Sequence, residues 1–227
     1  MALGHRMRSV FTVLFIAAAL LLTASCHDLN PQSTTPYMNR TDVQEKICNG
    51  VSGTYTASLS VGYTGFRADG QIDALHVIQL GSAAYIVGRH DNPFVVLNSF
   101  PVSLLSRVIA DPNLAALLAS QANATLTLPY SIVGDGPETH TGSIETVLSP
   151  YTFTVTDATG TSHAVTLSFN KTSIIAGINA DDSTTWRLSS LNLDLRSISV
   201  DGRIVQQFGA LHSGNASFMV KYRGEKQ

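Results

Sequence analysis

The chain has 227 residues and a formal net charge of -2 at pH 7; 13% of its residues are charged and 44% are hydrophobic. This hydrophobic content excludes a wholly disordered chain, because disorder requires low hydrophobicity combined with high net charge. The charge balance also excludes the basic surface that binds nucleic acid. We therefore expect a folded protein with no nucleic-acid partner, in which Ser and Thr replace many of the missing charged residues.

The first 25 residues have the organisation of a signal peptide. Arg6 and Arg8 precede residues 10–22, which are apolar apart from Thr12. An apolar run of this length suits the hydrophobic region of a signal peptide and is shorter than the roughly 20 residues that span a bilayer. We therefore expect residues 1–25 to be removed on export, with a retained transmembrane anchor as the weaker alternative.

A cysteine follows this segment directly. Residues 23–25 are small and precede Cys26, which resembles the signal of bacterial lipoproteins, although Thr23 stands where an aliphatic residue is usual. The resemblance implies lipidation of Cys26, attachment to the membrane through that lipid, and an outer-membrane protein that faces the periplasm or the cell surface. An ordinary secretory signal is the alternative. Cleavage before Cys26 would leave 12 basic and 16 acidic residues, so the mature chain would be more acidic than the full sequence.

Cys48 is the only other cysteine. A lone cysteine after Ile47 is predicted to be a small buried hydrophobic residue and not a nucleophile. If Cys26 is not lipidated, a bridge between Cys26 and Cys48 remains an alternative in an exported protein.

The mature chain divides into a tether and one domain. Residues 26–45 are polar and contain Pro31 and Pro36, a composition that is typical of a flexible tether. Residues 46–224 then form a single domain, since a chain of this length can bury most of its apolar surface in one core.

Six segments of this domain alternate apolar and polar residues, which is the pattern of a strand with one buried face and one wet face. They are residues 55–61, 125–132, 151–155, 165–170, 191–196 and 218–223. The repeated alternation predicts a mainly β fold, either an antiparallel β-barrel or a β-sandwich. Ser and Thr occupy most of the wet positions, which accounts for the low charge.

Turns and one helical insertion complete the predicted fold. Asp201-Gly202 and residues 157–160 have the composition of hairpin turns. Pro129 predicts an edge strand or a bulge, because proline cannot donate to a ladder. A short helical pair is expected near residues 102–121, where an Asp-Pro dipeptide marks the start of the second helix.

The closest approach to a metal site in the sequence is a group of His and acidic residues. Its members are Glu138, His140 and Glu145, with His90, Asp91 and His163 as distant contributors. Turn residues surround the group, which favours a solvated loop over a zinc site. No metal and no cofactor are therefore expected.

No catalytic residue is predicted. The sequence has no Gly-x-Ser-x-Gly motif and no glycine-rich loop that leads into a helix. Asp181 and Asp182 form a carboxylate pair, but a turn would leave both ionised and exposed. The same turn contains Asp182-Ser183-Thr184, which resembles the O-glycosylation signal of exported Bacteroidetes proteins and implies modification of Ser183.

The chain as a whole resembles the uncharacterised lipoproteins of Bacteroidetes. The resemblance is carried by the lipidation signal, the polar tether, residues 51–59 at the first strand, and residues 98–105, where a strand passes into a helix. Several of these families have calycin-like (lipocalin-like) β-barrels, which is the fold that the resemblance implies. The helical pair in mid-chain departs from the simplest lipocalin topology, and no functional residue is carried over.

These expectations leave the activity undetermined. We expect a non-catalytic binding or interaction module at the cell envelope, which holds a small apolar ligand, a glycan or a protein partner. A structural or adhesin-type surface component is the alternative, and a hydrolase with a convergent site is less favoured. Tyr55, Leu126, Tyr130 and Phe153 would line either a packed core or a pocket, and a packed core is the default for a small barrel. Neither the ligand-binding residues nor the oligomeric state is predicted.

Overall fold

The computed structural model describes residues 35–226 apart from residues 171, 189 and 211–213. The expected signal peptide and Cys26 lie outside the described residues. The chain divides into two units, Met1–Pro36 and Tyr37–Gln227, and every described helix and strand belongs to the second. None of the described helices is long and apolar enough to cross a membrane.

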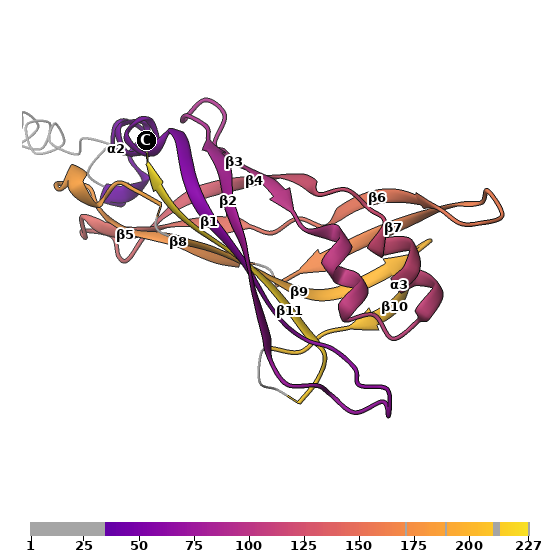
Figure 1. Ribbon diagram of the computed structural model, residues 1–227. Coiled ribbons are helices and arrows are strands. Elements are labelled where there is room, and N and C mark those ends of the chain that lie inside the picture. The colour runs from indigo at the N-terminus through magenta and orange to yellow at the C-terminus, as the bar shows by residue number, and fades with distance from the viewer. Residues whose placement is uncertain (1–34, 171, 189, 211–213, 227) are drawn as a thin grey trace, which may run out of the picture. The chain divides into compact units, whose positions relative to one another are not determined.

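In the described part of the chain, eleven strands form one antiparallel sheet that curls into a half-barrel (Figure 1). The strands are β1 (Gly53–Thr64), β2 (His76–Val87), β3 (Phe94–Phe100), β4 (Ala124–Gly134), β5 (Thr141–Val147), β6 (Tyr151–Thr156), β7 (Ser162–Phe169), β8 (Thr172–Asn179), β9 (Ser190–Val200), β10 (Arg203–Gln207) and β11 (Ser217–Lys226). Hydrogen-bonded neighbours follow the order β6-β7-β9-β11-β1-β2-β3-β4-β5-β8, and β10 pairs with β9 outside this path. The prediction of a mainly β, antiparallel fold is confirmed.

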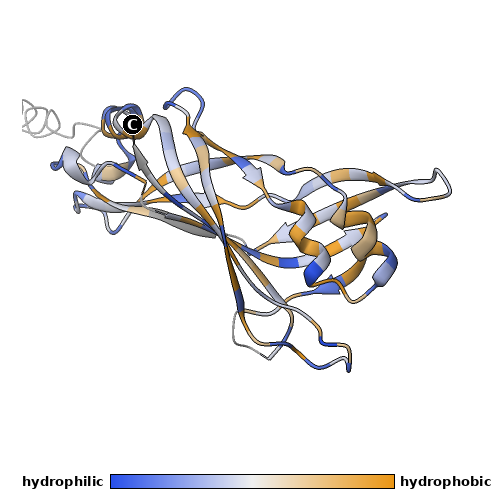
Figure 2. Cartoon of the chain, viewed as in Figure 1, coloured by the Kyte–Doolittle hydropathy of each residue, from blue (hydrophilic) through white to orange (hydrophobic). Residues whose placement is uncertain are grey.

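Alternating burial explains why these segments are strands. Along β4, every second residue from Leu126 to Ile132 is buried and the intervening residues are exposed. Figure 2 shows orange residues alternating with pale ones along the strands. The six segments that alternate in the sequence are β1, β4, β6, β7, β9 and β11. The alternation did not predict the other five strands, which are β2, β3, β5, β8 and β10.

Residues 37–45 belong to the folded unit and not to a tether, which corrects the predicted boundary. The 3-10 helix η2 (Tyr37–Asn39) and the α-helix α2 (Thr41–Val51) precede β1. Met38, Val43 and Ile47 are buried in the core. The segment looks polar in sequence because α2 is amphipathic, so that only one face of the helix is apolar.

The predicted helical pair is present in mid-chain. The first member, η3 (Val102–Arg107), is a 3-10 helix, and the second, α3 (Pro112–Ala119), is an α-helix. The Asp111 side chain caps α3 by accepting hydrogen bonds from two backbone N–H groups of its first turn. Leu105 and Leu118 are fully buried. The pair therefore contributes to the core.

Both predicted hairpins are confirmed. Asp201 and Gly202, with φ of 49° and 81°, connect β9 to β10, and residues 157–160 connect β6 to β7. The prediction for Pro129 is wrong, because β4 is an interior strand and the bulges recorded along it lie elsewhere. Pairing with β3 ends at Pro129 and pairing with β5 begins at Tyr130. Pro129 therefore lies where the pairing of β4 changes from β3 to β5, and the N–H that proline lacks is not needed by either ladder.

Large aromatic side chains pack together in the core. Tyr55 stacks on Tyr85 with ring centroids 4.8 Å apart. Phe100 contacts Phe169 and Phe218 with centroids 5.9 Å and 6.5 Å apart. All five rings are buried, so this interior is a packed core.

The residues that we considered for an internal pocket belong to this core. Tyr55, Leu126 and Tyr130 are buried, and Phe153 is partly buried against the same cluster. A ligand site in this protein is therefore to be sought on the surface of the sheet.

Candidate functional site

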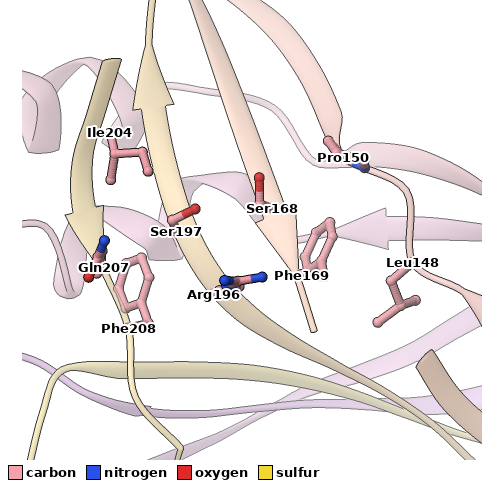
Figure 3. A pocket seen from close by; sticks show the side chains of 9 residues that line it. All are labelled: Leu148, Pro150, Ser168, Phe169, Arg196, Ser197, Ile204, Gln207 and Phe208. Atoms are coloured by element: carbon pink, nitrogen blue, oxygen red, sulfur yellow. The ribbon is translucent and has the colours of Figure 1, made fainter. Parts of the chain in front are cut away.

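A bulge in β9 shapes the candidate site. Residues 168–169 of β7 pair with Ser197 and Leu195, so Arg196 is the extra residue of the ladder. A bulge interrupts the alternation of faces and redirects side chains. Leu195 and Ile198 are buried in the core, whereas Arg196 and Ser197 both line a hollow (Figure 3).

We call this hollow, which has a volume of about 450 Å³, the β9 groove. Strands β7 and β9 contribute to it, together with β10 and the short connection between β5 and β6 (Figure 3). Its lining residues are Leu148, Pro150, Ser168, Phe169, Arg196, Ser197, Ile204, Gln207 and Phe208. The volume falls in the range of small-molecule sites, which is about 300–1,000 Å³.

The β9 groove combines polar donors with apolar walls. Arg196 supplies a guanidinium group, Ser168 and Ser197 supply hydroxyls, and Gln207 supplies a carboxamide. None of the lining residues is acidic. The backbone N–H of Phe208 donates to the carbonyl oxygen of Arg196 at 2.9 Å, which ties the end of β10 to the bulge.

The predicted metal candidates do not come together. Among the described residues, no group of three or more His, Cys, Asp or Glu is placed to hold a metal ion. Nδ1 of His140 lies 2.6 Å from Oδ2 of Asp181, and the His140 ring stacks on Tyr37 with centroids 3.6 Å apart. Glu145 instead accepts a hydrogen bond from the hydroxyl of Ser143 at 2.9 Å.

His163 joins the two predicted hairpin turns. Its Nδ1 lies 2.8 Å from Oδ2 of Asp201, and its Nε2 lies 3.4 Å from Oδ2 of Asp157. Hydrogen bonding to Asp201 and then to Asp157 raises the pKa of His163. The same contact with His163 lowers the pKa of Asp201. The remaining metal candidates also lie in turns: His90 and Asp91 between β2 and β3, and the exposed Glu138 between β4 and β5.

The two carboxylates of the Asp181-Asp182 pair have separate structural partners. Asp181 contacts His140. Asp182 caps the 3-10 helix η4 (Ser183–Thr185) and accepts hydrogen bonds from the hydroxyl and the N–H of Thr184. These hydrogen bonds lower the pKa of Asp182. Ser183 is exposed, and its glycosylation stays a prediction.

No activated nucleophile is evident in the described residues. No hydrogen bond among them joins a Ser, Thr or Cys side chain to a His, which is the contact that activates such groups. Cys48 is buried in α2, and this burial raises the pKa of its thiol. The prediction that Cys48 is a small buried residue is confirmed, and the inertness of its thiol stays a prediction.

A second hollow lies at an open strand edge. β1 pairs with nearly all of β2, whereas β3 pairs only with residues 85–87, and no other described strand pairs with the edge from His76 to Ala84. A hollow of about 300 Å³ occupies the point where β3 leaves β2. Val77 and Leu80 on this stretch are 61% and 38% exposed.

Sequence reasoning did not identify the β9 groove. The sequence contains one sign of the groove. Apolar residues follow one another at intervals of two up to Leu195, but the next one, Ile198, comes after an interval of three. Such an interval indicates a bulge. The remaining lining residues come from β5–β6, β7 and β10 and are brought together only by the sheet.

Comparison with known proteins gives no match that bears on the groove. No protein-family model matches this chain, and no curated protein or solved structure resembles it significantly.

Proposed function

We propose that the mature chain is a non-catalytic binding module of the cell envelope, anchored through a lipid on Cys26, and that it holds a small molecule in the β9 groove. The observation that carries the proposal is the groove itself, in which a bulge directs Arg196 and Ser197 into a hollow with apolar walls. Binding sites are typically concave and mostly apolar, with a few polar groups that fix orientation.

Two further observations support binding over catalysis. Aromatic side chains are packed in the core, so the groove offers space that the core does not. Three of the four described His residues, His76, His140 and His163, contact carboxylates, and none of the hydrogen bonds among the described residues joins a His to a Ser, Thr or Cys side chain. A hydrolase with a convergent site gains no support from this geometry.

Filling the groove tests the binding function. Ser168→Phe places a ring in the groove, and Ser162→Phe makes the same change on the same strand outside it. We expect native mass spectrometry of the full chain, purified from membranes of its host, to detect a small-molecule adduct on wild type and Ser162→Phe. The adduct should be absent from Ser168→Phe. An adduct that survives Ser168→Phe, or a wild type that carries none, would overturn the proposal.

The proposed location at the cell envelope is tested separately. The apolar run before Cys26 and the small residues that flank the cleavage point support export and lipidation. We expect mass spectrometry of the mature N-terminus to find acyl chains on Cys26, and Cys26→Ser to release the protein from the membrane fraction. An unmodified N-terminus at another residue would contradict the anchor without bearing on the groove.

The open edge of β2 favours a second candidate function, assembly with another copy of this chain. The edge from His76 to Ala84 contains no Lys, Arg, Asp or Glu, although charged residues are a usual protection of exposed edges. Two such edges can pair antiparallel about a two-fold axis without opposing charges. The bulge at Leu80, which is the extra residue opposite Leu59 and Ser60, divides this edge into two shorter pairing segments. This arrangement would make the protein a structural surface component.

Oligomeric state distinguishes this second candidate. We expect analytical ultracentrifugation of the full chain to show a dimer that Leu80→Lys dissociates. Ile86→Lys is the matched control, because Ile86 is 42% exposed on the same strand but pairs with both β1 and β3. A monomeric wild type, or equal effects of the two substitutions, would exclude assembly through this edge.

A further inference from the structure

We infer that the β9 groove selects an amphiphile with one anionic head group, which the guanidinium of Arg196 binds while the apolar body lies against the aromatic walls. This inference rests on the proposed binding function and adds the chemical class of the ligand.

The first step is the uncompensated charge of Arg196. No ion pair joins this side chain to a described acidic residue, and none of the residues that line the groove is acidic. The nearest acid along β9 is Asp194, which hydrogen-bonds to Asn170 and whose pKa is raised by burial. Arg196 is exposed, so water solvates its charge in the free protein; a bound anion would supply a counter-charge that none of the described acidic residues provides.

The second step is the arrangement of donors beside this charge. Ser168 and Ser197 face each other in the β7–β9 register, and both line the groove with Arg196 (Figure 3). A guanidinium presents parallel N–H groups that match the two oxygens of a carboxylate or a phosphate. Two hydroxyls at the same place add donors for the remaining lone pairs.

The third step is the apolar part of the groove. Phe169, Phe208 and Leu148 line it, and Ile204 on β10 is 61% exposed. Covering such side chains is favourable in proportion to the apolar area removed from water. Phe169 and Leu148 are themselves buried and Phe208 is partly buried, so Ile204 is the wall residue that a ligand would cover. A free inorganic anion would leave Ile204 exposed, whereas an anion with an apolar body covers it. The mature chain has an excess of acidic residues, so general electrostatic attraction would not favour anions, and selectivity for them has to come from Arg196.

Water-soluble probes that differ only in their head group test this class. They are 4-phenylbutanoate, 4-phenylbutyl phosphate, the neutral 4-phenylbutanol and the cationic 4-phenylbutylammonium. Dissociation constants are measured by saturation-transfer NMR on the full chain in nanodiscs of zwitterionic lipid, with empty nanodiscs as the blank. We expect at least one anionic probe to bind at least tenfold more tightly than the alcohol, and the cation to bind most weakly. The tighter of the two anions then assigns the head group to carboxylates or to phosphate esters.

Three variants connect the selectivity to Arg196. Arg196→Gln should abolish the preference for the anion over the alcohol, and Arg196→Lys should retain part of it because the charge remains without the paired N–H groups. Arg223→Gln, an exposed arginine on β11 outside the groove, is the matched control and should behave as wild type. Higher salt should weaken binding of the anion and leave the alcohol unchanged.

The outcomes separate this inference from the function on which it rests. Equal binding of alcohol and anions, abolished by Ser168→Phe, would overturn the anionic class and leave a binding groove. An anion preference that survives Arg196→Gln would also overturn the assignment. If no probe binds and no adduct is found on the protein from its host, both the inference and the proposed function fail.

Discussion

Replacing Gly50 by Ala tests how tightly α2 packs against Trp186. A Cβ at Gly50 would lie 2.4 Å from Cε3 of Trp186, which is closer than such atoms approach in real structures. The indole would have to move. Its Nε1 donates to the carbonyl oxygen of Asn179 at 2.7 Å, so the displacement also weakens a hydrogen bond.

Two opposing effects set the size of the change. Ala is favoured over Gly inside a helix by up to about 1 kcal/mol. Overpacking a filled site costs about 1–3 kcal/mol, and weakening the hydrogen bond of the indole adds about 1 kcal/mol. We therefore expect Gly50→Ala to lower the free energy of unfolding by about 1–3 kcal/mol.

A double-mutant cycle isolates the clash. Urea denaturation followed by circular dichroism is compared for wild type, Gly50→Ala, Trp186→Ala and the double variant. Because the clash requires the indole, Gly50→Ala in the Trp186→Ala background should stabilise the chain by up to about 1 kcal/mol. Trp186 is the only tryptophan, so a shifted fluorescence maximum in Gly50→Ala would report the moved ring. A stabilising Gly50→Ala in the wild-type background would refute this reasoning.

Three further predictions concern stability. His163→Gln should destabilise the chain most between about pH 4 and pH 6.5, because the stability that comes from the raised pKa of His163 is lost as the pH rises, and the stability that comes from the lowered pKa of Asp201 is lost as the pH falls. The urea midpoints of the variant and of wild type should therefore converge at about pH 9. A difference between the two midpoints that stays constant with pH would contradict the ion pair. Gly202→Ala should cost about 1–2 kcal/mol because φ is +81° there, and an unchanged melting temperature would show that the turn relaxes. Leu118→Ala should cost about 2–5 kcal/mol, since Leu118 is fully buried; the partly buried Leu117 is the control, and its change to Ala should cost less in the same urea assay.

The strands that were predicted differ from those that were missed in whether large apolar residues mark a buried face. β4 buries one face along its length, so its sequence alternates. The first half of β2 is largely exposed, and nothing in its sequence imposes a period of two. β5 does alternate in burial, but Gly142 and Thr146 occupy two of its three buried positions, so the apolar signal is lost. Alternation reveals a strand only where large apolar residues mark the buried face.

The start of the domain was missed for a different reason. Met38 is fully buried, yet it lies in a three-residue 3-10 helix, which is too short to display a period. Val43 and Ile47 are four residues apart on one face of α2. Two apolar residues among polar ones are weak evidence for a helix, and packing against the sheet, rather than local pattern, fixes this segment.

The candidate site was largely beyond sequence reasoning. The nine residues of the β9 groove come from four parts of the chain, and only their register in the sheet brings them together. The alternation up to Leu195 assigned Arg196 to solvent, and Arg196 is exposed, but alternation gives no sign of the hollow beside it. The bulge that gives it a neighbour on the same face depends on how β7 and β9 pair.

The pairing of β1 with β11 has a consequence for the timing of folding. Ser58 and Arg223 are 165 residues apart but lie opposite each other near the middle of the sheet. During synthesis, β1 and β2 can form a hairpin early, but the other edge of β1 has no partner until the last residues of the chain have emerged. Such non-local pairing slows folding. The order of the strands therefore postpones completion of the sheet until β11 is available, which is compatible with the export that we propose for this chain.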